Sequence, residues 1–218
     1  MDWFTSPLFQ KISRLADYFL ISLMWMVLSL PVITLVPATM AMYHTTVKVM
    51  RYRSGDSTLR CFWEAFRQNF KQVFFAGLLY AAAIMVLYTF LDVSRYFGMS
   101  SLFSKVYIPL FFLYSVLLVQ LTMLLLPVLS RFRMKLLHGI RLSWRLMWKG
   151  YGKLVVYTVA LFGVVVICYL IPPLTLVLPG IFCYSLSSHV EPILKEYFNE
   201  YADETMEIPY WLEEAWEE

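Results

Sequence analysis

Long stretches without Asp, Glu, Lys or Arg alternate along the chain with short basic segments. Four such stretches, residues 18–47, 72–91, 106–130 and 154–190, contain thirty, twenty, twenty-five and thirty-seven residues. A transmembrane helix needs about 20 consecutive apolar residues. The pattern therefore predicts an all-α fold, a polytopic membrane helix bundle.

The last uncharged stretch is too long for one helix and about long enough for two short ones. The pair Pro172-Pro173 divides it, because proline cannot continue a helix. We expect a tight hairpin there, and one span followed by a re-entrant segment is the alternative. Residues 1–190 would then form a membrane domain with about five spans, at residues 18–43, 72–91, 106–130, 154–171 and 174–190.

Prolines also interrupt the first stretch. Pro31 and Pro37 each remove a helical hydrogen bond, so this span is predicted to be bent or locally unwound. A similar pattern returns near the end of the membrane domain, and the corresponding residues are Pro31, Thr34 and Pro37 in the first copy and Pro172, Thr175 and Pro179 in the second. Either this is a parallel internal repeat, or the two copies are a chance similarity between apolar segments. We expect the two broken helices to form the centre of the bundle, where other helices cover their unwound backbone.

Two of the polar connections have the three-and-four spacing of amphipathic helices, over residues 59–74 and 137–151. Their apolar faces are rich in aromatic residues and their polar faces in Lys and Arg, which is typical of helices at a membrane surface. The connections after the first and third spans carry six and seven basic residues, and the other two carry two and none. By the positive-inside rule, this distribution predicts an N-terminus outside the cell and a cytoplasmic C-terminus.

Composition supports a membrane protein and adds an acidic tail. Hydrophobic residues make up 60% of the chain and charged residues 15%, compared with about 45–50% and about 25% in soluble domains. Residues 191–218 hold ten of the fifteen acidic residues and one Lys, so we expect an acidic cytoplasmic tail. This tail either folds back on the basic connections and competes with lipid, or stays solvated.

The candidate functional side chains are few. Gln120 is an amide inside the third span, which predicts an interhelical hydrogen bond, with a lining role in a pathway as the alternative. His44, His138 and His189 share no metal-ligand spacing. Because the sequence also contains no nucleophile elbow, phosphate-binding loop or zinc helix, we expect no enzymatic activity, no cofactor and no metal. The basic helices suit anionic lipid headgroups better than nucleic acid.

One set of residues in the first third of the chain forms a recognisable pattern: Ser6-Pro7, Leu15-Ala16-Asp17, Leu23, Trp25, residues 29–34, Pro37-Ala38, Ala41, Tyr43, Phe62, Phe66, Asn69, Phe70, Lys71 and Gln72. On these residues the chain resembles the YesL-like family of small bacterial membrane proteins of unknown function. Val36 departs from the glycine usual in that family.

The resemblance implies a multi-pass plasma-membrane protein, often encoded beside carbohydrate-uptake systems, with no established activity. We therefore expect a non-enzymatic accessory or assembly factor that contacts lipid and sugar-transporter subunits. The alternative is a small transporter or channel that acts on its own as a homo-oligomer, with the broken helices around a site near the membrane midplane.

Overall fold

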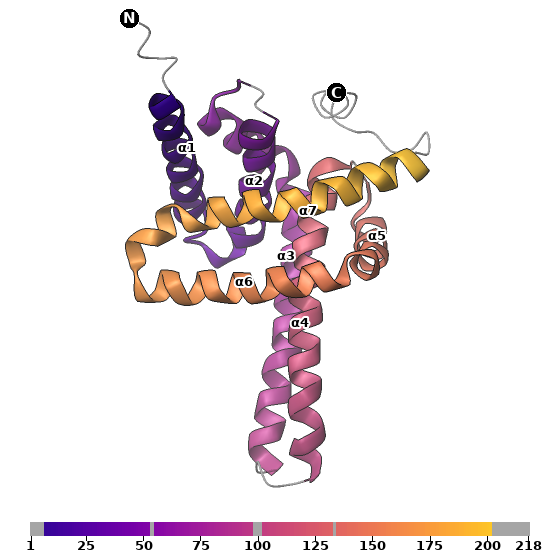
Figure 1. Ribbon diagram of the computed structural model, residues 1–218. Helices are drawn as coiled ribbons and strands as arrows, with labels where there is room; N and C mark the ends of the chain where they lie inside the picture. Colours follow the sequence, from indigo (N-terminus) through magenta and orange to yellow (C-terminus); the bar gives the residue numbers. More distant parts are fainter. Residues whose placement is uncertain (1–6, 53–54, 98–101, 133, 202–218) are drawn as a thin grey trace, which may run out of the picture.

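A computed structural model describes residues 7–52, 55–97, 102–132 and 134–201, and its regular structure there is entirely helical. The long helices are α1 (Pro7–Leu28), α3 (Thr58–Phe97), α4 (Leu102–Arg131), α6 (Tyr151–Leu170) and α7 (Leu178–Tyr201) (Figure 1). The shorter helices are α2 (Leu35–Thr45) and α5 (Leu136–Lys149), with two 3₁₀ turns, η2 (Val32–Thr34) and η4 (Pro172–Leu176), and the π-helical η3 (Thr46–Arg51). The all-α prediction is confirmed.

The first uncharged stretch forms a hairpin of two helices. Helix α1 ends at Leu28, and α2 packs back against it (Figure 1). Trp25, near the end of α1, donates a hydrogen bond from Nε1 to Oγ1 of Thr39, near the start of α2, over 3.0 Å. The prediction of one bent span over residues 18–43 is therefore wrong, because the chain reverses direction inside it.

The prolines explain where the helices stop and restart. Pro31 lies three residues after the end of α1, whereas Pro37 lies in the first turn of α2, where no backbone N–H is needed. The Thr34 hydroxyl closes the turn between them by donating to the carbonyl oxygens of Leu28 and Pro31.

The second proline motif has the same local structure. Helix α6 ends at Leu170, η4 begins at Pro172, and Pro179 lies in the first turn of α7. Tyr157 of α6 donates a hydrogen bond to the Ser185 carbonyl of α7 over 2.9 Å, and the two helices run antiparallel. The expected hairpin at Pro172-Pro173 is thus present as a helix reversal.

Helices α3 and α4 form the longest part of the molecule. They lie side by side and extend well beyond the other helices (Figure 1). The basic amphipathic segment predicted at residues 59–74 and the span predicted at residues 72–91 are one uninterrupted helix of forty residues. Such a helix is about 60 Å long, about twice the hydrocarbon thickness of a bilayer, so a bilayer crossed by α3 would contain only part of it.

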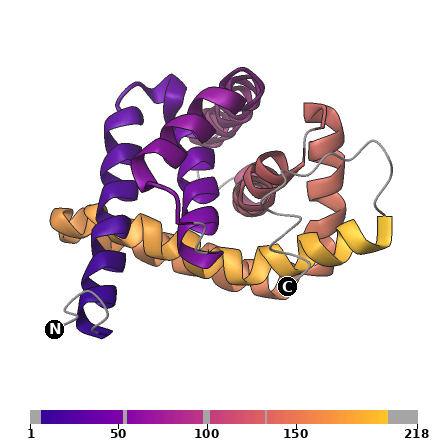
Figure 2. The same ribbon diagram turned by 90° about the horizontal axis from the view of Figure 1, so that it is seen from above.

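The remaining helices surround the base of this α3–α4 hairpin. Helices α6 and α7 lie across it, with α1 and α2 on one side and α5 on the other (Figures 1 and 2). One buried cluster joins α4, α5, α6 and α7 and includes Leu124, Leu146, Leu154 and Val190. A second cluster joins α1, α2, α3 and α7. Because α7 contributes to both clusters, it holds the two sides together.

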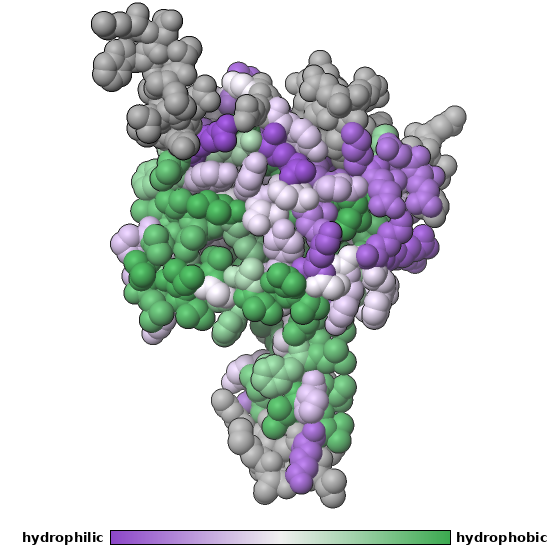
Figure 3. Space-filling model, viewed as in Figure 1, coloured by the Kyte–Doolittle hydropathy of each residue, from purple (hydrophilic) through white to green (hydrophobic). Residues whose placement is uncertain are grey.

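Three helices in the described part of the chain are long and apolar enough to cross a membrane. These candidate spans are residues 58–93, 105–131 and 151–170. The predicted count of five is not confirmed. Helix α6 has one buried residue, Leu154, and exposes apolar side chains over most of its surface. On the face shown in Figure 3, apolar surface covers the upper part of the α3–α4 hairpin and the end of the body where α6 meets α7, whereas hydrophilic surface gathers near α5 and the end of α7 and forms a stripe lower on the hairpin.

A single contact corrects the predicted path of the N-terminal region. The Thr58 hydroxyl, at the start of α3, donates a hydrogen bond to the Asp17 carboxylate of α1 over 2.7 Å. The predicted orientation puts Asp17, directly before the first predicted span, outside the cell and Thr58 in a cytoplasmic connection. The structure brings the two residues together because the α1–α2 hairpin returns to the side on which α1 begins.

Candidate functional site

A buried ion pair connects the end of α4 to the middle of α7. Nε of Arg131 lies 3.0 Å from Oε1 of Glu191, and the two side chains are 0% and 1% exposed. A buried charge is tolerated when it is paired and hydrogen-bonded. These two residues therefore depend on each other, although 60 positions separate them in the sequence.

Two tyrosines complete the surroundings of the Glu191 carboxylate. The Tyr43 hydroxyl donates to Oε1 over 2.9 Å, and the Tyr52 hydroxyl donates to Oε2 over 3.4 Å. The Arg131 guanidinium lies 5.6 Å from the centre of the Tyr43 ring, a cation–π distance. The charged pair is thus held by α2, by the residue after η3, by α4 and by α7. We call Tyr43, His44, Tyr52, Arg131 and Glu191 the buried charge cluster.

His44 is the member of this cluster whose ordinary pKa lies nearest pH 7. Its Nδ1 lies 3.4 Å from Nη1 of Arg131. Desolvation, followed by the charges of Arg131 and Lys48, lowers the pKa of His44 from 6.5 to about 3. The imidazole is therefore neutral near pH 7. Because arginine offers donors and no acceptor, Nδ1 is the accepting atom in this contact.

An apolar cavity lies beside the buried charge cluster, and Tyr43 belongs to both. The cavity has a volume of about 410 Å³ and is enclosed by α1, α2, α4, α6, η4 and α7. None of its lining residues carries a charge, and these residues are Trp25, Thr39, Met42, Tyr43, Val119, Thr122, Met123, Leu126, Pro127, Leu161, Val164, Val165, Cys168, Thr175, Pro179, Phe182, Cys183 and Leu186. A polar hydroxyl end and an apolar ring let Tyr43 connect the two features.

Of the residues singled out in the two proline motifs, Thr175 and Pro179 line this cavity, whereas Pro37 is buried in α2 and Pro31 and Pro172 are exposed. The helix that follows the second motif also contacts α1, because the backbone N–H of Gly180 donates to the Ser22 hydroxyl over 3.3 Å.

Asn69 lies away from the cavity. It lines a separate open pocket of about 510 Å³ with Gln72, Met134, Lys135 and Leu136, where α3 meets the start of α5. The Gln72 side chain donates a hydrogen bond to the Met134 carbonyl there. Asn69 and Gln72 therefore belong to the junction between α3 and the α4–α5 connection.

Gln120 is fully buried, but neither of its amide atoms has a hydrogen-bond partner within the described part of the chain. The predicted interhelical hydrogen bond is absent there, so α4 and its neighbours are held by apolar packing and the buried charge cluster. A buried amide without a partner is unfavourable. Gln120 thus differs from Arg131, whose position is set by contacts on several helices.

The structure does not gather the three histidines into one site. His44 contacts Arg131, His138 is exposed on α5, and the ring of His189 stacks on Tyr157 with their centres 5.9 Å apart. Within the residues that the structure describes, no group of three or more His, Cys, Asp or Glu side chains could hold a metal ion.

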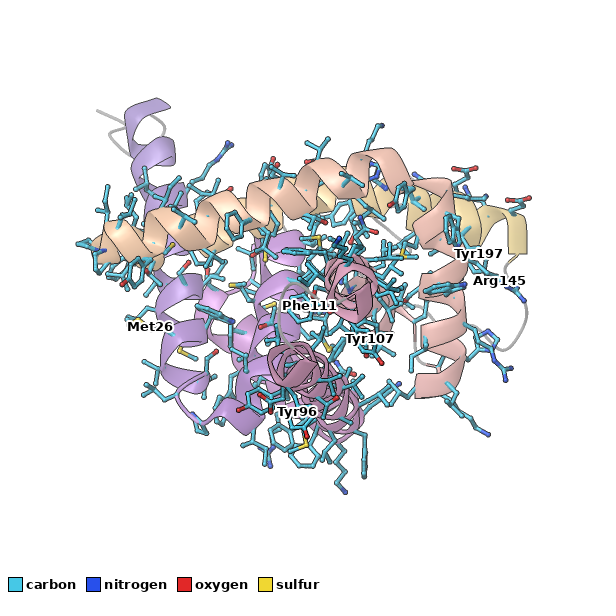
Figure 4. All side chains as sticks on the ribbon, turned by 90° about the horizontal axis from the view of Figure 1, so that it is seen from below. Met26, Tyr96, Tyr107, Phe111, Arg145 and Tyr197 are labelled. Atoms are coloured by element: carbon cyan, nitrogen blue, oxygen red, sulfur yellow. The ribbon has the colours of Figure 1, made fainter. Side chains whose placement is uncertain are left out.

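The first part of the predicted tail folds back on the basic helix α5. Helix α7 continues without a break across residue 190 to Tyr201, so no boundary separates the membrane domain from residues 191–201. Nζ of Lys149 lies 3.6 Å from Glu196 and 3.4 Å from Glu200. Arg145 and Tyr197 lie near each other where α5 meets α7 (Figure 4), and both line the same small pocket. Residues 202–218 lie outside the described residues.

Sequence reasoning missed the buried charge cluster. It assigned Arg131 to a basic surface connection and Glu191 to a solvated or surface-bound tail. One signal was available, because each of them is the first charge after a long uncharged stretch. That signal places a charge at the end of a helix, but it cannot show that two such ends meet.

Comparison with known proteins gives one match. Residues 18–90, about a third of the chain, match the model of a family described as "Protein of unknown function, DUF624". The matched part covers the second half of α1, the α1–α2 hairpin and most of α3. No curated protein and no solved structure matches the chain. The match supports an uncharacterised family and assigns no activity.

Proposed function

We propose that this protein is a non-enzymatic accessory or assembly partner of a carbohydrate-uptake system in the bacterial plasma membrane. The uncharged lining of the internal cavity supports this proposal most directly. A sugar pathway needs hydrogen-bonding groups that replace the water around the sugar hydroxyls. Since the cavity offers few hydrogen-bonding groups of this kind, the protein assists sugar transport that takes place through other subunits. The YesL-like resemblance motivates the choice of carbohydrate.

The surface of α6 provides the proposed contact with a partner. Val156, Val159 and Phe162 are 66%, 68% and 71% exposed. In a bilayer such a face meets either lipid or the helices of another protein, and small residues allow helices to approach closely. Gly163 has open space where a side chain would point. We propose that α6 packs against a spanning helix of a sugar-transporter subunit.

We further propose that α3 and α4 cross the membrane and that the side bearing α5 faces the cytoplasm. The exposed basic residues of α5 favour that side by the positive-inside rule. Helix α7 returns to α5, so Tyr201 faces the cytoplasm whether α6 and α7 cross fully or re-enter. The contact between Asp17 and Thr58 supports putting the start of α1 on the same side, in place of the outside position expected from five spans.

Co-isolation from native membranes tests this function. A tagged copy should retain sugar-transporter subunits, and Phe162→Ala on α6 should reduce the retained amount. Met85→Ala is the matched control, because Met85 is 73% exposed on α3, away from the proposed contact. Solute flux into liposomes that contain this protein alone would instead establish the transporter alternative. Equal retention by the two variants would refute the α6 contact.

A further inference from the structure

The apolar cavity is formed largely by helices that are apolar enough to lie in a lipid bilayer. Two of the three candidate spans supply much of its wall, with residues 119–127 of α4 and residues 161–168 of α6. The volume of about 410 Å³ falls within the usual range of ligand sites, about 300–1,000 Å³. An empty apolar cavity of this size is unfavourable, because its lining loses packing contacts.

Four polar residues of the wall, Trp25, Thr39, Tyr43 and Thr122, already have hydrogen-bond partners inside the protein. Nε1 of Trp25 donates to Thr39, whose hydroxyl donates to the Leu35 carbonyl over 2.7 Å. The Thr122 hydroxyl donates to the Leu118 carbonyl over 2.7 Å, and the Tyr43 hydroxyl donates to Glu191. A ligand that needs several hydrogen bonds, such as a sugar or an ion, would have to break these contacts. A hydrocarbon chain would keep them.

We propose that this cavity binds one acyl chain of a membrane phospholipid. The bilayer supplies acyl chains in excess at the depth of α4 and α6. Water is a poor occupant, because apolar cavities stay dry and take up apolar molecules. This site requires no sugar-transporter partner, so the protein would bind the lipid on its own.

The position of Tyr43 gives the bound chain a structural role. Its ring lines the cavity, and its hydroxyl and ring face contact Glu191 and Arg131. A chain packed against this ring limits its movement and so holds the hydroxyl on the carboxylate. Occupancy of the cavity therefore supports the junction of α2, α4 and α7.

Photo-crosslinking of the full-length protein tests the site. The protein is placed in nanodiscs of phosphatidylethanolamine and phosphatidylglycerol that contain phosphatidylethanolamine with a diazirine in the middle of one acyl chain. After irradiation, mass spectrometry should find adducts on cavity-lining peptides from α2, α4 and α7. Val164→Trp should lower this labelling roughly tenfold or more, because the indole fills the space needed by the chain.

Val159→Trp is the matched control, because Val159 lies on the same helix, is 68% exposed and does not line the cavity. This variant should keep wild-type labelling of the cavity peptides. Labelling confined to outward-facing residues, or equal labelling in the two tryptophan variants, would overturn the proposal. Cavity labelling by a diazirine fatty acid but not by the phospholipid would also overturn it. The wild-type adduct map remains decisive even if Val164→Trp fails to fold.

Discussion

Removing one member of the Arg131–Glu191 pair should be far more damaging than removing both. Glu191→Leu leaves a fully buried guanidinium without its carboxylate, and Arg131→Met leaves the carboxylate without its cation. Breaking a buried pair from one side costs about 3–5 kcal/mol. For a chain of 218 residues this corresponds to a decrease in Tm of roughly 6–20 °C.

The double variant Arg131→Met with Glu191→Leu removes both charges and keeps similar volumes. The main loss of stability that remains comes from the Tyr43 hydroxyl, because this group loses its hydrogen-bond acceptor. That loss is about 1–3 kcal/mol. If the stability losses of the two single variants were additive, the double variant would lose about 6–10 kcal/mol of unfolding free energy. The difference predicts a coupling energy of at least about 3 kcal/mol between the two residues.

The assay is thermal unfolding in detergent, with the fraction of folded monomer measured by size-exclusion chromatography. Arg60 and Glu64 provide the control pair, since they lie 2.8 Å apart with 81% and 47% exposure. Replacing them in the same way should leave the Tm unchanged, because water already solvates both charges. The reasoning would be refuted if each single variant unfolded with a free energy within about 1 kcal/mol of wild type. It would also be refuted if the stability lost by the double variant equalled the sum of the two single losses.

Four further predictions follow from individual contacts. Stability should fall as the pH drops below about 6.5 and keep falling toward pH 3, because the unfolded chain binds the His44 proton more readily than the folded protein does. His44→Asn should reduce the slope of the pH–stability curve in this range by up to about 1.4 kcal/mol per pH unit. Cysteines at Asp17 and Thr58, in a chain whose native cysteines are replaced by serine, should form a disulfide in membranes under mild oxidation. Gln120→Leu should raise the Tm, because the buried amide lacks a partner among the described residues. Thr34→Val should lower stability by about 1–2 kcal/mol, because two carbonyls of the turn lose a donor.

Each of these predictions has an outcome that contradicts it. A pH–stability curve that His44→Asn leaves unchanged would show that the imidazole is not buried neutral. If the cysteines at Asp17 and Thr58 remain reduced under this oxidation, α1 does not pack on α3 at this contact. Loss of stability in Gln120→Leu would reveal a partner for the amide, and an unchanged Thr34→Val would show that the prolines alone set the turn.

Several features of the fold could be predicted from neighbouring residues. The uncharged stretches match α3, α4 and α6, because apolar length is a property of a short window of sequence. The breaks at Pro31 and Pro172 also appeared where expected, because proline blocks helix continuation locally. The direction of the chain after each break could not be predicted from the prolines alone. A kinked helix and a reversed helix have the same prolines, so the single span over residues 18–43 was wrong.

The candidate site shows the same division. Thr175 and Pro179 were marked by their resemblance to the first proline motif, and both line the cavity. No local pattern marked Arg131 and Glu191 as partners, because their pairing arises from the packing of α4 on α7.

By itself, the sequence determined an all-helical chain with helices apolar enough to span a membrane, with proline-bounded helices and basic amphipathic surfaces, because each of these depends on hydropathy, helix period or proline geometry within a few turns. The tertiary structure alone decided that α1 and α2 turn back, that α7 continues past residue 190 and that a buried ion pair lies beside an apolar cavity. These features depend on which distant helices meet. Burial converts two ordinary charges, one at the end of α4 and one in the middle of α7, into a linked pair, and only the packed structure shows that burial.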